Sequence, residues 1–453
     1  MKKILATAVA LGLVVGVAAS ASALELKIKG SYQVDGYYLN QGNGAAGDGG
    51  VIPWNDATYR AITGKTGTPG NDDWYEHEFR IKPNLIINDK VQIKSDIRLI
   101  DSNTVWGHQA DLQTANGGNM KVRKLWLLYD SPIGRWEIGR RPAGSWGSDF
   151  VNSGTAADRI MFRPNLPEHW QGYVFLEKQL ENDAYQSNLD DNDSDYYEVS
   201  AGYTKNRTNA WLGAGLTLDK DPVDTLYKQP AIGKDFRKIT TYHTMGFVQQ
   251  GITDNLTLVG EFDYKWGHKE FTDTSKPDLD INAWAYFAAL AGNYGNLSTT
   301  LGYAHIDGDG NPQDNTDHAY DVVNGTGADF QPLYILTGSA TDILNGDRGP
   351  NLVGTAVRQA GVDAFVALAD YKTTDKLTLH GGIGAGWADD APAGVDDAYG
   401  WEFDLGAAYK LYKNLTYEVH FGYWAVGDFA KLGNPDFDTQ DVYLVSHHLT
   451  MKF

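Results

Sequence analysis

Charged side chains recur at every second position along many short stretches of the chain. In residues 74–82, for example, Glu76, Glu78 and Arg80 alternate with aromatic and aliphatic side chains. A period of two places the charged set on one face of a β-strand and the apolar set on the other. Such a charged face can attract, orient and select charged solutes through Coulomb forces, which requires no catalytic group.

The candidate functional residues are these alternating charges, and they sort by position along the chain. Basic side chains dominate the early strands and acidic ones the late strands, so we expect a basic wall and an acidic wall around a polar interior that favours anions. The basic candidates are Arg80, Lys82, Lys94, Arg98, Lys121, Arg123, Arg135, Arg141, Arg159 and Arg163. The acidic candidates are Glu261, Asp263, Glu402, Asp404 and Glu418. Carboxylates among the basic set, such as Glu78 and Asp96, leave a second interpretation open, in which local ion pairing produces a polar interior without strong selectivity.

Other kinds of chemistry find little support in the chain. It contains no cysteine, no Gly-x-Ser-x-Gly elbow, no His-Glu-x-x-His pair and no Walker loop, so we expect no catalytic residues and no enzyme. A formal net charge of -20 argues against nucleic acid as a partner, because phosphate binding needs a basic face.

One metal site stays open as an alternative to an expectation of no cofactor. Asp307, Asp309 and Asn311 offer oxygen ligands at alternate positions, as calcium-binding loops do. The stretch lacks the glycine at its sixth position and the glutamate at its twelfth that an EF-hand loop requires. Ca²⁺ in external loops and a merely solvated acidic loop therefore both remain possible interpretations.

The first residues have the composition of an export signal. Two lysines precede an apolar run over residues 4–19, and small residues at 21 and 23 form a cleavage site, which predicts a signal peptide over 1–23. The run is shorter than the roughly 20 residues that a membrane-spanning helix needs. No long apolar stretch follows, and residues 24–453 are expected to form a single domain.

The alternating stretches predict a long series of antiparallel strands. A turn signature of Asn or Lys, then Leu, then Ser or Thr recurs within 254–257, 295–298, 375–378 and 413–416. An even number of strands returns both chain ends to the same side, so we expect eighteen, or sixteen if residues 158–180 belong to a loop. The strands should begin near residues 24, 74, 90, 120, 135, 158, 170, 196, 209, 237, 255, 279, 297, 359, 376, 399, 414 and 439.

The last segment alternates apolar residues from Tyr443 to a terminal Phe453. This pattern resembles the closing strand of outer-membrane barrel proteins. A membrane protein without spanning helices has the closed barrel as its other option. We therefore predict an all-β transmembrane antiparallel up-and-down β-barrel in the bacterial outer membrane, with long external loops, short periplasmic turns, apolar faces toward lipid and charged faces toward a water-filled lumen. In a soluble sandwich the same apolar faces would form a core.

A second resemblance lies in residues 129–141, where two strands flank a Pro-Gly turn. The stretch resembles a strand-turn-strand of Gram-negative porins in which a Gly-Arg-Gln or similar triplet leads toward the constriction; here Arg141 replaces the glutamine. Residues 142–156 sit where such porins fold a loop into the barrel. With eighteen strands, the chain resembles the specific porins and the alginate-export channels, whose lumens carry basic ladders.

The resemblance implies passive diffusion of small hydrophilic, anionic solutes. It further implies a homotrimer embedded in outer-membrane lipid and lipopolysaccharide. The alternative is a barrel that acts as a sheath or scaffold for a partner, such as an electron-transfer conduit, with a blocked or filled lumen.

Overall fold

The structure is a computed structural model of the chain. It describes residues 24–42, 51–63, 70–106, 120–144, 146–148, 150, 156–181, 193–220, 236–275, 277–311, 314–320, 332–337 and 360–453. The predicted signal peptide, residues 1–23, lies outside the described residues, so its cleavage stays a prediction.

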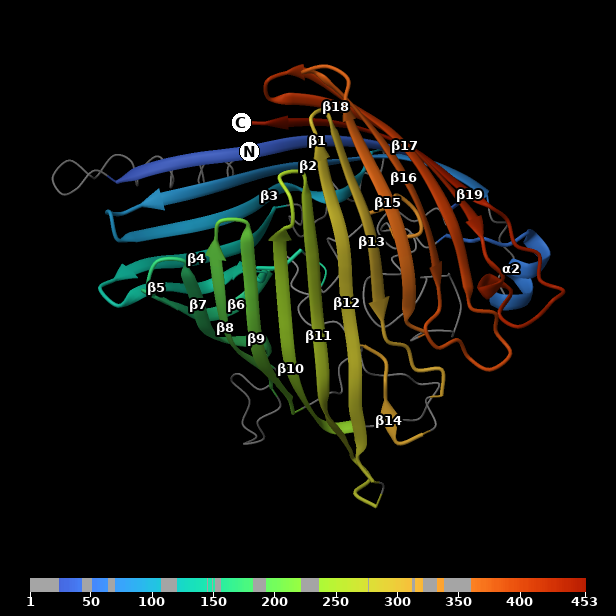
Figure 1. The fold of residues 1–453 in the computed structure, drawn as a ribbon, viewed down its shortest axis with the longest axis horizontal. Coiled ribbons are helices and arrows are strands. Elements are labelled where there is room, and N and C mark those ends of the chain that lie inside the picture. The colour runs from blue at the N-terminus through green and yellow to red at the C-terminus, as the bar shows by residue number, and fades with distance from the viewer. Residues whose placement is uncertain are drawn as a thin grey trace, which may run out of the picture.

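Eighteen long antiparallel strands form one sheet that closes on itself. Each strand pairs with its neighbours along the chain, and the first strand pairs with both the second and the last (Figure 1). The predicted closed barrel of eighteen strands is therefore confirmed. The alternative of sixteen is wrong, because residues 156–164 and 170–180 form two paired strands of the wall.

Each of the eighteen long strands begins within four residues of its predicted position. A two-residue strand, β14, pairs in parallel with β12 outside the series of long strands. The strands are β1 (Glu25–Gly42), β2 (Gly70–Ile86), β3 (Val91–Val105), β4 (Lys121–Ser131), β5 (Gly134–Pro142), β6 (Ala156–Pro164), β7 (Trp170–Leu180), β8 (Ser194–Lys205), β9 (Thr208–Asp219), β10 (Phe236–Gly251), β11 (Leu256–Phe271), β12 (Leu279–Tyr294), β13 (Leu297–Ile306), β14 (Thr316–Asp317), β15 (Val362–Lys372), β16 (Leu377–Trp387), β17 (Ala398–Tyr412), β18 (Leu415–Val426) and β19 (Val442–Lys452).

Side-chain oxygens close the short turns at one end of the barrel. Asn88 Oδ1 accepts hydrogen bonds from the backbone N–H groups of Lys90 and Val91, each at 2.9 Å. Thr374 Oγ1 accepts from the backbone N–H groups of Lys376 and Leu377, at 3.2 and 3.0 Å. Short polar side chains favour tight turns because they replace a backbone acceptor in this way.

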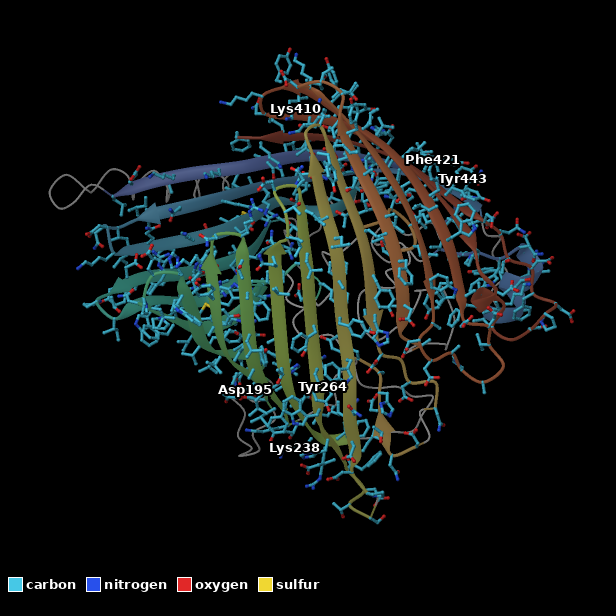
Figure 2. All side chains as sticks on the ribbon, viewed as in Figure 1. Asp195, Lys238, Tyr264, Lys410, Phe421 and Tyr443 are labelled. Carbon is cyan, nitrogen blue, oxygen red and sulfur yellow. The ribbon has the colours of Figure 1, made fainter. Side chains whose placement is uncertain are left out.

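Large apolar side chains cover the outer surface of the barrel, and small ones line parts of the inside. On β12, Trp284 and Leu290 are each 42% exposed, whereas Ala283 and Ala285 are fully buried. Figure 2 shows Phe421 and Tyr443 on the outer margin of the wall formed by β18 and β19. The sheet thus presents its more hydrophobic face to the outside of the barrel, whereas a soluble β-sandwich buries that face in its core.

Two short helices lie at the barrel end opposite the short turns. Helix α2 (Asp56–Thr63) and the 3₁₀ helix η1 (Asp428–Lys431) are joined through Trp54, whose indole Nε1 donates a 2.7 Å hydrogen bond to the carbonyl of Ala430. Among the described residues, the helices are too short and too polar to cross a membrane.

The last residue completes the barrel closure. Gly30 and Phe453 exchange two backbone hydrogen bonds, with N···O distances of 2.9 and 3.0 Å. The Phe453 ring lies directly over Gly30, where a Cβ atom would come within 2.5 Å of the ring and 2.7 Å of the Arg80 carbonyl oxygen. Glycine at this position therefore allows the terminal aromatic ring to lie flat on the seam.

We expect Gly30→Val to destabilise the barrel, because the new side chain meets backbone that cannot move aside. Overpacking of this kind costs about 1–3 kcal/mol. The measurement is the temperature at which the folded band disappears on an SDS gel of unheated and heated samples. Gly381→Val is the matched control, since a Cβ at Gly381 meets no atom within 4 Å. Equal melting of the two variants would contradict the role of this seam.

Candidate functional site: the barrel interior

Arginine–carboxylate pairs cover the inner face of β2 and β3. Arg80 Nε donates to Asp96 Oδ1 at 2.6 Å, and a second guanidinium nitrogen contacts the other carboxylate oxygen. Arg98 lies between Glu78, at 2.6 Å, and Asp101, at 2.7 Å. These contacts hold two of the predicted basic candidates within local ion pairs.

A second ion-pair cluster covers β5, β6 and β7. Glu137 accepts from Arg141 at 2.8 Å and from Arg163 at 3.1 Å. Arg159 is paired with Glu177, and its guanidinium carbon lies 3.9 Å from the centre of the Phe175 ring. Arg141 and Arg159 are 4% and 3% exposed, so burial restricts their direct contact with a diffusing solute.

Two other basic candidates are paired nearer the strand ends. Lys121 pairs with Asp101, and Arg135 Nε lies 2.6 Å from Asp130 Oδ1. The three remaining candidates, Lys82, Lys94 and Arg123, form no ion pair with a carboxylate of the described chain. Seven of the ten basic candidates therefore form local ion pairs, as the second interpretation of the sequence expects.

Glu261 holds a loop segment inside the barrel. Its Oε2 atom accepts from both the backbone N–H and the hydroxyl of Ser148, each at 2.5 Å. Gly147, with φ of +99°, allows this approach, because a Cβ there would lie 2.6 Å from the carboxylate. On the same segment, Trp146 donates from its indole to Tyr173 Oη at 2.6 Å. The described part of residues 142–156 therefore packs against the inner wall, where the porin resemblance predicted an inserted loop.

Glu402 and Asp404 hold a second segment, residues 332–337. Ile335 N–H donates to Glu402 Oε1 at 2.7 Å, Leu336 N–H contacts the other Glu402 oxygen, and Tyr334 N–H donates to Asp404 Oδ2 at 3.1 Å. Three successive backbone donors thus face two buried carboxylates. This arrangement compensates the cost of burying carboxylate groups, which is large when they lack donors.

The same segment presents one aromatic side chain to the inner wall. Tyr334 stacks on His420 with ring centres 4.5 Å apart and planes 14° apart. Burial first, and the nearby carboxylate of Asp404 second, raise the pKa of the Tyr334 phenol above its usual range. The phenol therefore stays neutral at physiological pH.

The remaining acidic candidates have different neighbours. Asp263 is fully buried and accepts from the hydroxyl of Tyr320 at 2.7 Å. Glu418 lies 3.8 Å from His420 and lines a cavity near the short turns. Four of the five acidic candidates therefore accept hydrogen bonds from residues outside the long strands; they are Glu261, Asp263, Glu402 and Asp404. Their charges do not simply face the basic side chains across an open interior.

Two of the predicted calcium ligands, Asp307 and Asp309, already have hydrogen-bonding partners in the chain. Asp307 Oδ1 lies 2.7 Å from His305 Nε2, and its other oxygen accepts from the Trp284 N–H at 2.6 Å. Asp309 is buried and accepts instead from the backbone of Asn311 at 3.2 Å. Calcium binding by these three residues stays a prediction.

A different group could hold a metal ion. Ligand atoms of His305, Asp363 and Asp389 lie within 4.8 Å of one another in the part of the chain that the structure describes. Burial raises the pKa of the Asp389 carboxyl above its usual range. His305 already contacts Asp363 at 2.9 Å, so an imidazole shared between carboxylates accounts for the cluster without a metal.

Sequence reasoning missed the anchoring role of the acidic side chains. Such a contact joins two parts of the chain that are distant in sequence, for example Glu402 and residues 335–336. The alternation within one strand carries no information about which loop segment its acidic side chains will bind. The available signal was the apolar run Leu333, Ile335 and Leu336 within a polar loop, since all three side chains are at most 1% exposed.

The comparisons with known proteins agree with this geometry at the level of the fold. The chain is similar in structure to the outer membrane protein OpdK from Pseudomonas aeruginosa (TM-score 0.52, 11% identity, covering 94% of this chain and 99% of that chain). It is also similar to OccK3 (OpdO) from the same organism (TM-score 0.51, 12% identity, 94% and 96%) and to a BenF-like porin from Pseudomonas fluorescens (TM-score 0.50, 12% identity, 94% and 99%). No family model and no curated protein sequence matches the chain. These likenesses show that the chain shares its fold, a closed barrel of eighteen long strands in this protein, with outer-membrane porin structures.

We expect the double substitution Glu402→Gln and Asp404→Asn to release residues 332–337 from the wall. An amide places an N–H₂ group where a backbone N–H now donates, and each buried donor left unpaired costs about 1–3 kcal/mol. Chymotrypsin cleavage at residues 333–336 should accelerate at least tenfold, and single-channel conductance should rise.

Glu418→Gln is the matched control for this experiment. It removes a charge from the inner face of the adjacent strand β18 without touching a backbone donor of the inserted segment. Cleavage at the parental rate in the double variant would show that the carboxylates do not hold the segment.

Proposed function

We propose that the protein is an outer-membrane porin, a water-filled channel for passive diffusion of small hydrophilic solutes. The observation that carries the proposal is the inverted wall: a closed barrel with bulky apolar side chains outside and charged side chains inside. Such a wall suits lipid on one side and water on the other. The likeness to porin structures supports the fold on which the proposal rests.

We further propose that the channel favours anions. Lys82, Lys94 and Arg123 form no ion pair within the described chain, while most arginines of the same wall are neutralised by carboxylates. An unpaired cation in a narrow channel raises the local concentration of anions. OpdK, the structural neighbour, has also been solved with vanillate, which is a carboxylate.

Planar-bilayer recordings of the purified protein test both parts of the proposal. We expect stepwise open channels, and a reversal potential in a KCl gradient that indicates preference for chloride. The triple substitution of Lys82, Lys94 and Arg123 by glutamine should remove most of that preference, because it deletes three positive charges from the inner wall. Absence of open channels would refute the porin, whereas cation preference in the parent protein would refute only the anion bias.

The matched control replaces Lys90, Lys205 and Lys376 by glutamine. These lysines lie in exposed turns at the barrel end and likewise form no ion pair within the described residues. The control changes the net charge by the same amount and should leave the reversal potential nearly unchanged. If the control variant shifted the reversal potential as much as the Lys82, Lys94 and Arg123 variant does, the anion preference would have to be attributed to the net charge of the protein.

The homotrimer in lipid and lipopolysaccharide stays a prediction, as does the alternative of a sheath around a partner. Two loop segments inside the lumen, held by Glu261 and by Glu402 with Asp404, narrow the barrel with the chain's own residues. Co-purification of a stoichiometric partner protein would favour the sheath over the porin.

A further inference from the structure

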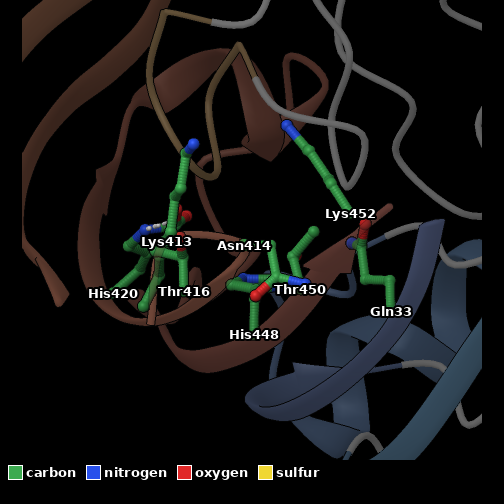
Figure 3. Close-up of a pocket in the computed structure, with 9 residues that line it drawn as sticks. Gln33, Lys413, Asn414, Thr416, His420, His448, Thr450 and Lys452 are labelled. Carbon is green, nitrogen blue, oxygen red and sulfur yellow. Dashed lines mark ion pairs between the residues drawn. The ribbon is translucent and has the colours of Figure 1, made fainter. Parts of the chain in front are cut away.

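A cavity of about 530 Å³ opens on the inner face of β18, β19 and β1, close to the short turns (Figure 3). Two cross-strand rows lie at its floor, and all of their residues except Asp35 line the cavity. Thr450 on β19 lies between Thr416 on β18 and Gln33 on β1, and the next row places His448 between Glu418 and Asp35. The first row offers two threonine hydroxyls, which can donate hydrogen bonds, while the Gln33 amide donates to Asp35.

The carboxylates of the second row have partners already. Asp35 accepts from Gln33 Nε2 at 2.9 Å and contacts His448 Nδ1 at 2.6 Å. Glu418 lies 3.8 Å from His420 Nε2. Asp35 is therefore paired with an imidazole, Glu418 remains a carboxylate of the cavity lining, and neither acid forms an ion pair with Lys413 or Lys452 among the described residues.

Two lysines, Lys413 and Lys452, stand at that open side. Figure 3 shows their side chains rising on opposite sides of the floor, with Asn414 and Thr450 between them. The backbone N–H of Lys452 donates to the carbonyl of Asn414 at 2.9 Å, which fixes the spacing of the two lysine backbones. Both side chains are exposed, and neither forms an ion pair with a carboxylate in the described ranges.

We propose that this cavity binds a small dianionic oxyanion, of the phosphate or dicarboxylate class. The two ammonium groups hold its charge from either side, and the hydroxyls of Thr416 and Thr450 donate to its oxygens. The inference rests on the proposed function, because it makes the cavity an anion-binding site of the proposed channel, at the barrel end that carries the short turns. It is distinct from the arginine clusters of β2 to β7, whose charge is locally neutralised.

Calorimetry with inorganic phosphate tests the site without requiring conductance. Phosphate titrated into the detergent-solubilised full chain should bind with saturation. The double variant Lys413→Gln, Lys452→Gln should bind at least tenfold more weakly, and Lys413→Gln alone should lose part of the affinity, which covers the case in which substitution next to Phe453 impairs assembly. Thr450→Val should also weaken binding, by a few-fold, because it deletes a donor without changing charge.

Bilayer recordings give a second readout on the same proteins. Phosphate added on the side of the short turns should interrupt the chloride current in a saturable manner, and the lysine double variant should lose these interruptions. The matched control is Lys205→Gln, Lys376→Gln, which removes two turn lysines at the same barrel end away from the cavity.

The outcomes separate this site from the porin proposal. Phosphate binding without any open channel would keep the site and refute the porin. Open channels without saturable phosphate binding, or equal weakening in the control variant, would overturn the site and leave the porin standing.

Discussion

Closure of the sheet is the constraint on which the other features depend. Because β19 pairs with β1 up to the last residue, every long strand has a hydrogen-bonded neighbour on both sides. A free edge would expose backbone polar groups, which cost several kcal/mol each in hydrocarbon. Once the edge is removed, no unpaired backbone group of the long strands faces hydrocarbon. The apolar side chains of each strand can then point outward and the polar ones inward.

Inside the barrel, the type of charged residue matches its role. The paired cations on the inner wall are mostly arginines, such as Arg80 and Arg159, and those without a described partner are mostly lysines, such as Lys82 and Lys452. The planar guanidinium matches the two oxygens of a carboxylate, whereas a flexible ammonium remains hydrated. The arginines therefore stabilise the wall, and the lysines carry most of the positive charge on which the proposed anion preference rests.

The buried acids have a structural role that complements this division. Glu261, Glu402 and Asp404 accept backbone hydrogen bonds from loop segments, so that the wall shapes the lumen through loops rather than through its own charge alone. A carboxylate can be buried at tolerable cost when several N–H donors converge on it. The width of the barrel interior therefore depends on contacts between strands and loops that are far apart along the chain.

The order and facing of the strands could be predicted from the sequence, and their number to within one hairpin, because a period of two and short turn signals are local properties. The alternation in 74–82 and the turns at 254–257 and 413–416 sufficed for that. Which charges form ion pairs could not be predicted in this way: Arg98 and Lys94 both lie at alternating positions of one strand, but Arg98 has two carboxylates beside it in the folded chain. Pairing across strands and insertion of loops depend on distances between residues remote in sequence, and no local pattern encodes those distances.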